Sequence, residues 1–203
     1  RVIGLTGSIG MGKSTVAGHL RARRLAVFDA DAEVHRLYSG KAAPLIEAAF
    51  PGTVVDGAVD RSRLSKALLA GADGFKKLEA VVHPLVVAAE RRFLRAQHKL
   101  GAAAAVLEIP LLYETGADAR VDVVIVVSTT REEQRRRVLG RKAMSAAMLG
   151  QLLSRQLDDD EKRRRADFVV DTSGPVTDTA VRIDQVLALI ADHEATAFDR
   201  HWK

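Results

Sequence analysis

The sequence predicts an α/β protein built on a doubly wound, parallel five-stranded sheet. Five short runs of apolar residues recur along the 203 residues, and each run is rich in β-branched side chains. The runs are almost entirely apolar rather than alternating with polar residues, which is typical of strands buried on both faces. Longer segments with helical periodicity separate them, as crossovers between parallel strands require. The expected strands lie at residues 2–6, 25–28, 104–109, 121–127 and 168–170.

A glycine-rich loop follows the first expected strand. Residues 7–14 have the spacing G-x-x-x-x-G-K-S and precede a segment that reads as the start of a helix. In such a loop the backbone N–H groups point inward at an anion, the lysine reaches the β- and γ-phosphates, and the serine hydroxyl faces Mg²⁺. The sequence therefore predicts a P-loop for a nucleoside triphosphate with magnesium. The residues expected to bind it are Gly7, Ser8, Ile9, Gly10, Met11, Gly12, Lys13, Ser14 and Thr15.

Acidic side chains follow two of the expected strands. Asp29 and Asp31 come at the carboxyl end of the second strand, the end of a parallel sheet that faces the ligand crevice. A carboxylate there can accept the proton of an attacking hydroxyl, but Asp31 can equally cap the helix that follows. Glu108 ends the third strand and is a candidate to hydrogen-bond a group that binds magnesium, or to pair with a nearby arginine.

The gap between the second and third strands is too long for a simple crossover. Helical periodicity at residues 42–50, 60–70 and 75–100 predicts a helical insertion, residues 41–101, that holds a substrate. Pro84 lies inside the longest of these segments and should kink it or divide it in two.

An arginine-rich helical stretch follows the fourth strand. It is interrupted at residues 140–145, where a small kinase would carry a closing lid. We expect this lid at residues 139–165. The remaining core comprises residues 1–40, 102–138 and 166–203, and the whole chain is expected to form one domain with subdomains.

The composition limits the classes of ligand and partner. The net charge of +5 is a mild excess, because 31 Lys and Arg stand against 26 Asp and Glu. The arginine clusters lack interleaved aromatic residues, which disfavours nucleic acid; they are typical of solvated helix faces or of sites for a phosphorylated substrate. The chain has no Cys and no apolar run near the roughly 20 residues of a membrane span. We expect a cytoplasmic protein with no nucleic-acid ligand, no membrane association and no obligatory protein partner.

Other nucleotide-binding classes compete with a kinase. A GTPase switch reads its base with N-K-x-D, and the chain contains no Asn. A motor or ATPase subunit would show an apolar strand ending in Asp or Asp-Glu; Glu108 is the nearest imitation, and Pro110 follows it closely. Another small-molecule or nucleotide kinase stays open. So does a nucleotide-gated regulator that binds ATP without a small acceptor.

Further motifs give a resemblance to one family. His83-Pro84-Leu85 and the segment 109–114, Ile-Pro-Leu-Leu-Tyr-Glu, are more diagnostic than the P-loop, which many families share. With them, nearly the whole chain resembles the dephospho-coenzyme A kinases, which catalyse the last step of coenzyme A synthesis. The resemblance also includes residues 7–14, Asp29, Asp31, Asp60, Arg61, Leu64, Leu78, Gln134, Arg137, Arg141, Gln151, Gln156, Lys162 and residues 166–171.

The resemblance implies a reaction and its cofactors. A phosphoryl group of ATP would pass to the ribose 3′-hydroxyl of dephospho-coenzyme A, with Asp31 as the general base. Lys13 and Arg141 would neutralise the transferring phosphoryl group, and Arg137 would assist from the lid. Gly174 would join the nucleotide-binding residues.

The resemblance also implies where magnesium and the acceptor bind. Ser14 would hold Mg²⁺, with Asp31 or Glu108 as further candidates. His83 would serve the substrate site, although a lone His beside an apolar helical stretch is also typical of a core or interface residue. The residues implied to bind the acceptor are Asp31, His35, Arg61, Lys77, His83, Pro84, Leu111, Leu112 and Glu114.

Two positions depart from the family pattern. Ser8 stands where family members usually carry a second glycine, which restricts φ there but leaves Gly7 and Gly12 intact. Thr172 replaces an Asn that commonly follows the last strand. Since that loop is where the ATP base is expected, the preference for a particular base is less well specified than phosphate binding.

Overall fold

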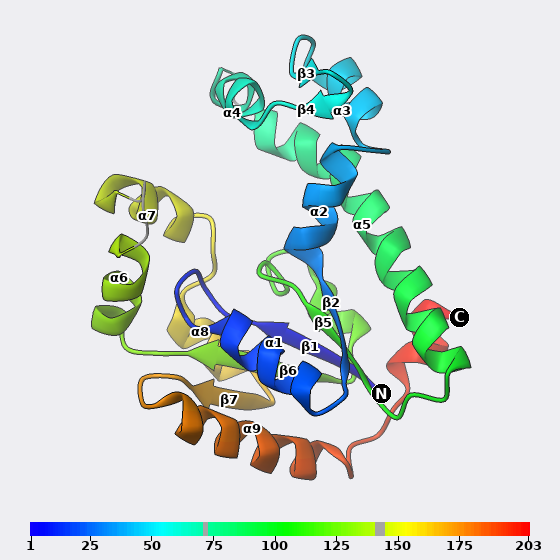
Figure 1. The fold of residues 1–203 in the computed structure, drawn as a ribbon, viewed down its shortest axis with the longest axis vertical. Coiled ribbons are helices and arrows are strands. Elements are labelled where there is room, and N and C mark those ends of the chain that lie inside the picture. Colours follow the sequence, from blue (N-terminus) through cyan, green and yellow to red (C-terminus); the bar gives the residue numbers. More distant parts are fainter. Residues whose placement is uncertain (71–72, 141–144) are drawn as a thin grey trace. The chain divides into compact units, whose positions relative to one another are not determined.

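The computed structural model describes residues 1–70, 73–140 and 145–203 (Figure 1). Arg141, the expected lid arginine, lies outside these residues. Along the described chain the elements are β1 (Val2–Thr6), α1 (Lys13–Ala22), β2 (Ala26–Asp29), α2 (Ala30–Tyr38), α3 (Ala43–Ala49), β3 (Val54–Val55), β4 (Ala58–Val59), α4 (Arg61–Leu69), α5 (Gly74–Lys99), β5 (Ala105–Glu108), η1 (Ala117–Arg120), β6 (Val123–Ser128), α6 (Arg131–Leu139), α7 (Ala146–Leu153), α8 (Asp159–Arg165), β7 (Phe168–Asp171), α9 (Val176–Ile190) and η2 (Phe198–Trp202).

The central sheet has the strand order β2-β5-β1-β6-β7. β1 lies between β5 and β6 and runs parallel to both, and β7 runs parallel to β6. Every residue of β1, β5 and β6 is buried, as the unbroken apolar runs of the sequence predict. The predicted five-stranded α/β fold is confirmed. Each expected strand begins and ends within two residues of the observed one.

Both faces of the sheet are covered. Ile3 and Leu5 of β1 belong to a buried apolar cluster that includes Leu20 of α1 and Ile183 of α9. α1 and α9 are in contact with each other, and Figure 1 shows α9 next to β7. Because side chains alternate along a strand, Gly4 faces the other way. A Cβ at Gly4 would lie 2.7 Å from Cδ1 of Leu112, so the glycine makes room for the segment after β5.

The chain forms two compact units. Residues 1–28 and 94–203 make the larger unit, and residues 29–93 make the smaller one. The larger unit contains the sheet and the glycine-rich loop. The smaller unit contains α2, α3, α4, the β3–β4 hairpin and most of α5, and its buried apolar residues include Leu37, Ile46, Phe50, Leu64 and Leu68.

The smaller unit differs from expectation in two places. Pro84 does not divide its helix, because α5 continues from Gly74 to Lys99. The proline is exposed and so is Ala80, the residue whose carbonyl would accept its missing N–H, so water can hydrate that carbonyl. The β3–β4 hairpin was not predicted. Its turn residues Asp56 and Gly57 both have positive φ, 51° and 79°, the geometry that an Asp-Gly pair favours between two antiparallel strands.

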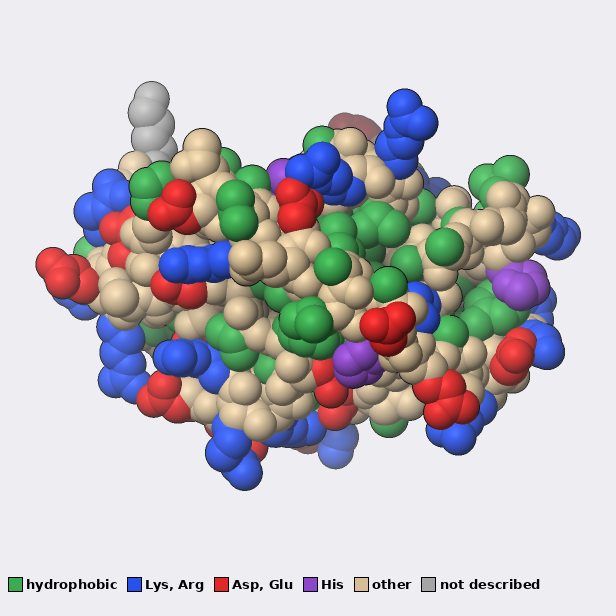
Figure 2. All heavy atoms as spheres, turned by 90° about the horizontal axis from the view of Figure 1, so that it is seen from below, with side chains coloured by type: hydrophobic (Ala, Val, Ile, Leu, Met, Phe, Trp, Pro, Cys, Tyr) green, Lys and Arg blue, Asp and Glu red, His purple; other side chains and the backbone are tan. Residues whose placement is uncertain are grey.

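The surface carries mixed charge. On the face drawn in Figure 2, basic and acidic side chains alternate with apolar and uncharged ones instead of gathering by sign. None of the helices in the described ranges has the length and hydropathy that crossing a membrane requires.

Candidate active site

The glycine-rich loop connects β1 to α1 and bends sharply at its glycines. Gly7 has a φ of 150°, and a Cβ there would lie 2.4 Å from the carbonyl oxygen of Val127, so any side chain would collide with β6. Gly12 has a φ of 94° directly before α1. Ser8 is not among the non-glycine residues with positive φ, which in the described chain are Arg24 and Asp56. The serine therefore fits a position where the family usually has glycine.

Side chains hold several carbonyl oxygens of this loop. Nζ of Lys13 donates to the oxygen of Gly7 over 2.9 Å, and Nε2 of Gln134 donates to that of Ile9 over 2.8 Å. Oγ1 of Thr172 donates to the oxygen of Met11 over 2.7 Å. A loop that presents its N–H groups to a phosphate must turn its carbonyls away, where they need donors. These three donors are what that orientation requires.

A second glutamine reaches the same loop from the segment after α7. The N–H of Ile9 donates to Oε1 of Gln156 over 3.2 Å. The next residue is fixed in turn, because the N–H of Leu157 donates to Glu114 over 2.6 Å. Glu114 pairs with the fully buried ammonium of Lys162 at 2.9 Å. The segment after β5 is thus tied to the segment between α7 and α8 and to α8 itself.

Arg137 of α6 is held on two sides. Its Nε donates to Glu133 over 2.7 Å, while Nη1 and Nη2 donate to the hydroxyl and carbonyl oxygens of Thr172 over 3.0 and 2.6 Å. Hydrogen bonds from Arg136 and Arg137 lower the pKa of Glu133 to about 2. Glu133 therefore stays ionised and keeps the guanidinium beside the loop.

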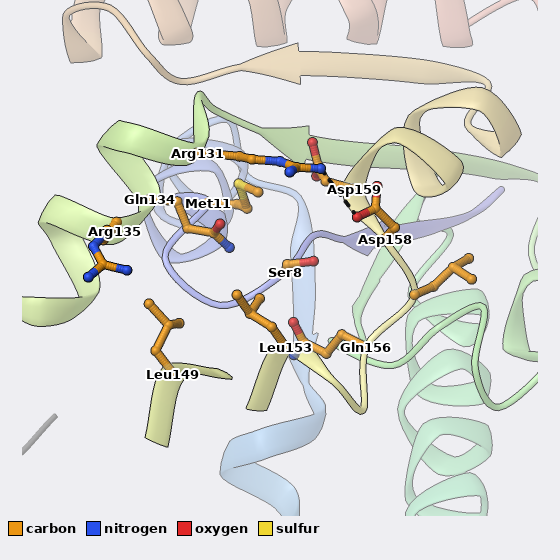
Figure 3. A pocket seen from close by; sticks show the side chains of 11 residues that line it. Ser8, Met11, Arg131, Gln134, Arg135, Leu149, Leu153, Gln156, Asp158 and Asp159 are labelled. Carbon is orange, nitrogen blue, oxygen red and sulfur yellow. Dashed lines mark ion pairs between the residues drawn. The ribbon is translucent and has the colours of Figure 1, made fainter. Parts of the chain in front are cut away.

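A pocket of about 360 Å³ opens beside the loop, between α6, α7 and the start of α8 (Figure 3). Figure 3 shows Arg131 and Asp158 at one end, joined by an ion pair of 3.6 Å. Burial raises the pKa of Asp159, which accepts a hydrogen bond of 2.6 Å from the Ser128 hydroxyl. The pocket lining is Ser8, Met11, Arg131, Gln134, Arg135, Leu149, Leu153, Gln156, Leu157, Asp158 and Asp159.

The smaller unit has its own groove, of about 480 Å³. Its lining combines one carboxylate and one guanidinium with mostly apolar side chains: Asp31, Val34, Tyr38, Arg61, Leu64, Ser65, Leu68 and Leu78. Such a mixture suits an acceptor with a long, largely apolar body and a few polar groups.

Asp31 is not the cap of its helix. Asp29 occupies that position, and its carboxylate accepts the N–H of Ala32 over 2.9 Å. Asp31 lies in the first turn of α2, is exposed, and lines the groove. The alternative reading of Asp31 as an N-cap is therefore wrong.

Two expected acceptor residues meet in the same unit. Arg61 hydrogen-bonds Nδ1 of His35, and its guanidinium lies 6.0 Å from the ring centroid of Tyr38. Arg61 lines the groove that contains Asp31, and His35 contacts it there through Arg61. Lys77, His83 and Pro84 are all exposed on α5.

The remaining expected residues lie in the larger unit. Leu111 is half-buried, and Leu112 is fully buried against Gly4, a core position. Glu114 is engaged by Lys162 and Leu157, as described above. Gly174 is exposed in the loop between β7 and α9. The expected parts of these residues in ligand binding stay predictions.

Magnesium ligands are sparse in the described residues, where no three His, Cys, Asp or Glu side chains gather as a metal site would require. Ser14 is exposed in the first turn of α1, beside Lys13. Glu108 lies opposite Leu5 in the sheet, and its carboxylate is 3.9 Å from the guanidinium of Arg21. One hydroxyl suits Mg²⁺, which keeps several waters and takes further oxygens from substrate phosphates.

Sequence reasoning assigned no role to several of these groups. Gln134, Gln156 and Lys162 were part of the resemblance only, and Thr172 was linked to base preference rather than to the loop. Each contacts at least one residue more than 45 positions away, so no local pattern could reveal that contact. The fully buried Lys162 had one available signal, its place next to an acidic run at the start of α8.

Comparison with known proteins identifies the family. The model of the dephospho-CoA kinase family matches residues 1–178. The chain is 53% identical over 196 residues to the dephospho-CoA kinase of Brucella melitensis, covering 97% of this chain and 98% of that protein. It is 52% identical over 191 residues to that of Rhodopseudomonas palustris, covering 94% and 96%. The structure of dephospho-CoA kinase from Campylobacter jejuni superposes with a TM-score of 0.70 at 26% identity, over 94% of this chain and 96% of that one. The chain belongs to the dephospho-CoA kinase family.

Proposed function

We propose that this chain transfers the γ-phosphoryl group of ATP to the ribose 3′-hydroxyl of dephospho-coenzyme A, giving coenzyme A and ADP. The observation that carries the proposal is the P-loop, whose carbonyls of Ile9 and Met11 accept hydrogen bonds from Gln134 and Thr172 and so point away from the phosphate side. The match of residues 1–178 to this family agrees with it. ATP as donor also favours a location in the cytoplasm, where ATP is made and used.

The nucleotide side of the reaction falls to the larger unit. The loop of residues 7–15 binds the phosphates through its backbone N–H groups, apart from those that donate within the protein, such as the N–H of Ile9 to Gln156. The ammonium of Lys13 binds the γ-phosphoryl group. Arg137, and Arg141 from the lid segment 139–165, neutralise charge that builds on the phosphoryl oxygens during transfer. Gly174 borders the base. When bound at Ser14, Mg²⁺ supplies charge neutralisation and orients the phosphates.

The acceptor side falls to the smaller unit. Asp31 accepts the proton of the 3′-hydroxyl as its oxygen attacks the γ-phosphorus and the bond to the β,γ-bridging oxygen breaks. His35 and Arg61 bind polar groups of the acceptor, together with Lys77 and His83. The apolar lining of the groove takes the long arm of dephospho-coenzyme A.

A panel of acceptors tests this function. The protein is incubated with MgATP and dephospho-coenzyme A, shikimate or a nucleoside monophosphate, and ADP is followed. We expect stimulation by dephospho-coenzyme A. Stimulation by a nucleoside monophosphate instead would assign another small-molecule kinase, and ADP release that no acceptor stimulates would assign a nucleotide-gated regulator.

A further inference from the structure

We propose that Thr172 is a positioning residue, which holds the guanidinium of Arg137 and the P-loop in one fixed arrangement. The inference rests on the proposed function, because it takes Arg137 to act on nucleotide phosphates. Thr172 follows β7 and touches neither phosphates nor acceptor in this account. It acts through Arg137 and Met11.

The hydroxyl of Thr172 is buried and bonded on both sides. Thr172 is 5% exposed. Its Oγ1 lies 2.7 Å from the carbonyl oxygen of Met11 and 3.4 Å from that of Ser128. A hydroxyl has one proton, so the shorter contact takes it, and the lone pairs face Nη1 of Arg137 at 3.0 Å. One oxygen atom thus links the loop to α6.

The backbone of Thr172 makes further hydrogen bonds to β6 and to Arg137. Its N–H donates to Ser128 over 2.9 Å, which anchors the residue to the end of β6. Its carbonyl oxygen accepts from Nη2 of Arg137 over 2.6 Å. A Cβ on Gly12 would lie 3.0 Å from Oγ1 of Thr172 and 3.3 Å from Nη1 of Arg137, so the loop packs closely against both side chains.

This arrangement fixes the guanidinium before any ligand binds. Three of its five N–H donors are directed at Glu133 and Thr172. The other two project from a rigid fork whose orientation is already set. Because less side-chain freedom is then lost on binding an anion, a held Arg137 should bind phosphate more tightly than a loose one.

Matched substitutions separate the hydroxyl from the shape of the side chain. Thr172→Val keeps the volume but removes the donor to Met11 and the acceptor for Arg137, whereas Thr172→Ser keeps both. We expect Thr172→Val to weaken MgATP affinity and raise its KM by about tenfold, the usual effect of leaving a buried partner unpaired. Thr172→Ser should restore most of the loss, and the KM of the acceptor should change little in either variant.

Thr53→Val is the matched control. Thr53 is equally buried, and its hydroxyl donates to the carbonyl of Phe50 over 2.7 Å in the other unit. Both Thr→Val variants should lower the melting temperature, but only that of Thr172 should weaken nucleotide binding. An equal nucleotide affinity in the Val and Ser variants of Thr172, or an equal loss in Thr53→Val, would overturn the proposal.

A double-mutant cycle tests the route through Arg137. In an Arg137→Met background, Thr172→Val should weaken nucleotide affinity clearly less than it does in the parent, because only its contact with the Met11 carbonyl is then left to lose. Additive losses would overturn the proposal. If Thr172→Val does not fold, Thr172→Ala supports the same cycle. Nucleotide affinity is measured without acceptor, so the cycle tests Thr172 whether or not the parent protein phosphorylates an acceptor. A parent protein that releases no acceptor-dependent ADP would refute the proposed function, not the role of Thr172.

Discussion

Single donor groups from distant parts of the sequence support the P-loop. Thr172 is one of them, and its hydroxyl gives the replacement of the family Asn a physical reading. An Asn amide offers one donor group and one acceptor group, the same pair that the threonine hydroxyl offers to Met11 and Arg137. Thr172 can therefore give the loop and Arg137 the same kinds of hydrogen bond that an Asn side chain offers.

Asp31→Asn should lower kcat by about 10²–10⁴, the usual range for loss of a general base, and leave MgATP affinity nearly unchanged. Asn keeps the shape of Asp but accepts no proton. Asp29→Asn is the control, because Asn also caps helices and should preserve the contact to Ala32. ATP titrations of both variants with and without Mg²⁺ complete the measurement. Turnover close to the parent would remove Asp31 as the base, and a magnesium-dependent loss of affinity would make it a metal ligand.

Protonation of Glu133 at low pH should remove the hydrogen bonds that it accepts from Arg136 and Arg137 and so destabilise α6. Its pKa falls from 4.5 to about 2 in the folded protein, so its hydrogen bonds stabilise fully above the higher value and are lost as the pH falls toward the lower one. Between about pH 5 and about pH 3, the melting temperature of Glu133→Gln should therefore fall less than that of the parent protein. Equal acid sensitivity in the two proteins would show that Glu133 does not hold Arg137 as described.

Between elements, the Glu114–Lys162 pair ties the segment after β5 to α8. Removing one partner of a buried ion pair leaves an uncompensated charge. Glu114→Gln can still accept the N–H of Leu157 but leaves the buried ammonium unpaired, and should cost about 3 kcal/mol or more of unfolding free energy.

Adding Lys162→Met should recover part of that loss, because the double variant buries no charge. Urea denaturation of the parent, the single and the double variant measures both effects. A double variant less stable than Glu114→Gln alone would mean that Lys162 stabilises chiefly by its contact with the Pro110 carbonyl, at 3.4 Å.

At the scale of the whole molecule, nucleotide binding should raise stability through the P-loop. At about 100 times its dissociation constant, MgATP should add about 2.7 kcal/mol to the unfolding free energy. Lys13→Ala should abolish this gain and turnover, yet barely change the melting temperature without nucleotide, since Lys13 is only partly buried. Lys99→Ala, an exposed lysine at the end of α5, is the control. A large loss of apo stability in Lys13→Ala would make Lys13 a structural residue.

The sheet and the P-loop could be predicted because their signals are local. A strand buried on both faces is one continuous apolar run, and the loop is one spaced motif between a strand and a helix. The β3–β4 hairpin could not be found as strands, because two-residue strands are too short to show a pattern, although Asp56-Gly57 was an available turn signal. The sequence could not decide between a kink and a break at Pro84, because it does not show that Ala80, whose carbonyl is affected, is exposed.

The supporting contacts of the site were out of reach for a different reason. Gln134 donates to the carbonyl of Ile9 from 125 positions away, and Gln156 accepts from the N–H of the same residue from 147 positions away. Only the folded sheet brings them together. Asp31 had two possible roles, and the helix-capping role could be removed only by knowing which residue caps α2. The observed start of α2 shows that this residue is Asp29.

The measurement that tests the central claim most directly is the position of the transferred phosphate. The protein is incubated with MgATP and dephospho-coenzyme A, and the product is examined by phosphorus NMR and mass spectrometry. We predict one added phosphoryl group, attached to the ribose 3′-oxygen, formed with an equal amount of ADP and lost in Lys13→Ala. A phosphoryl group on another atom of the acceptor, or ADP formed without a phosphorylated product, would contradict the proposed function.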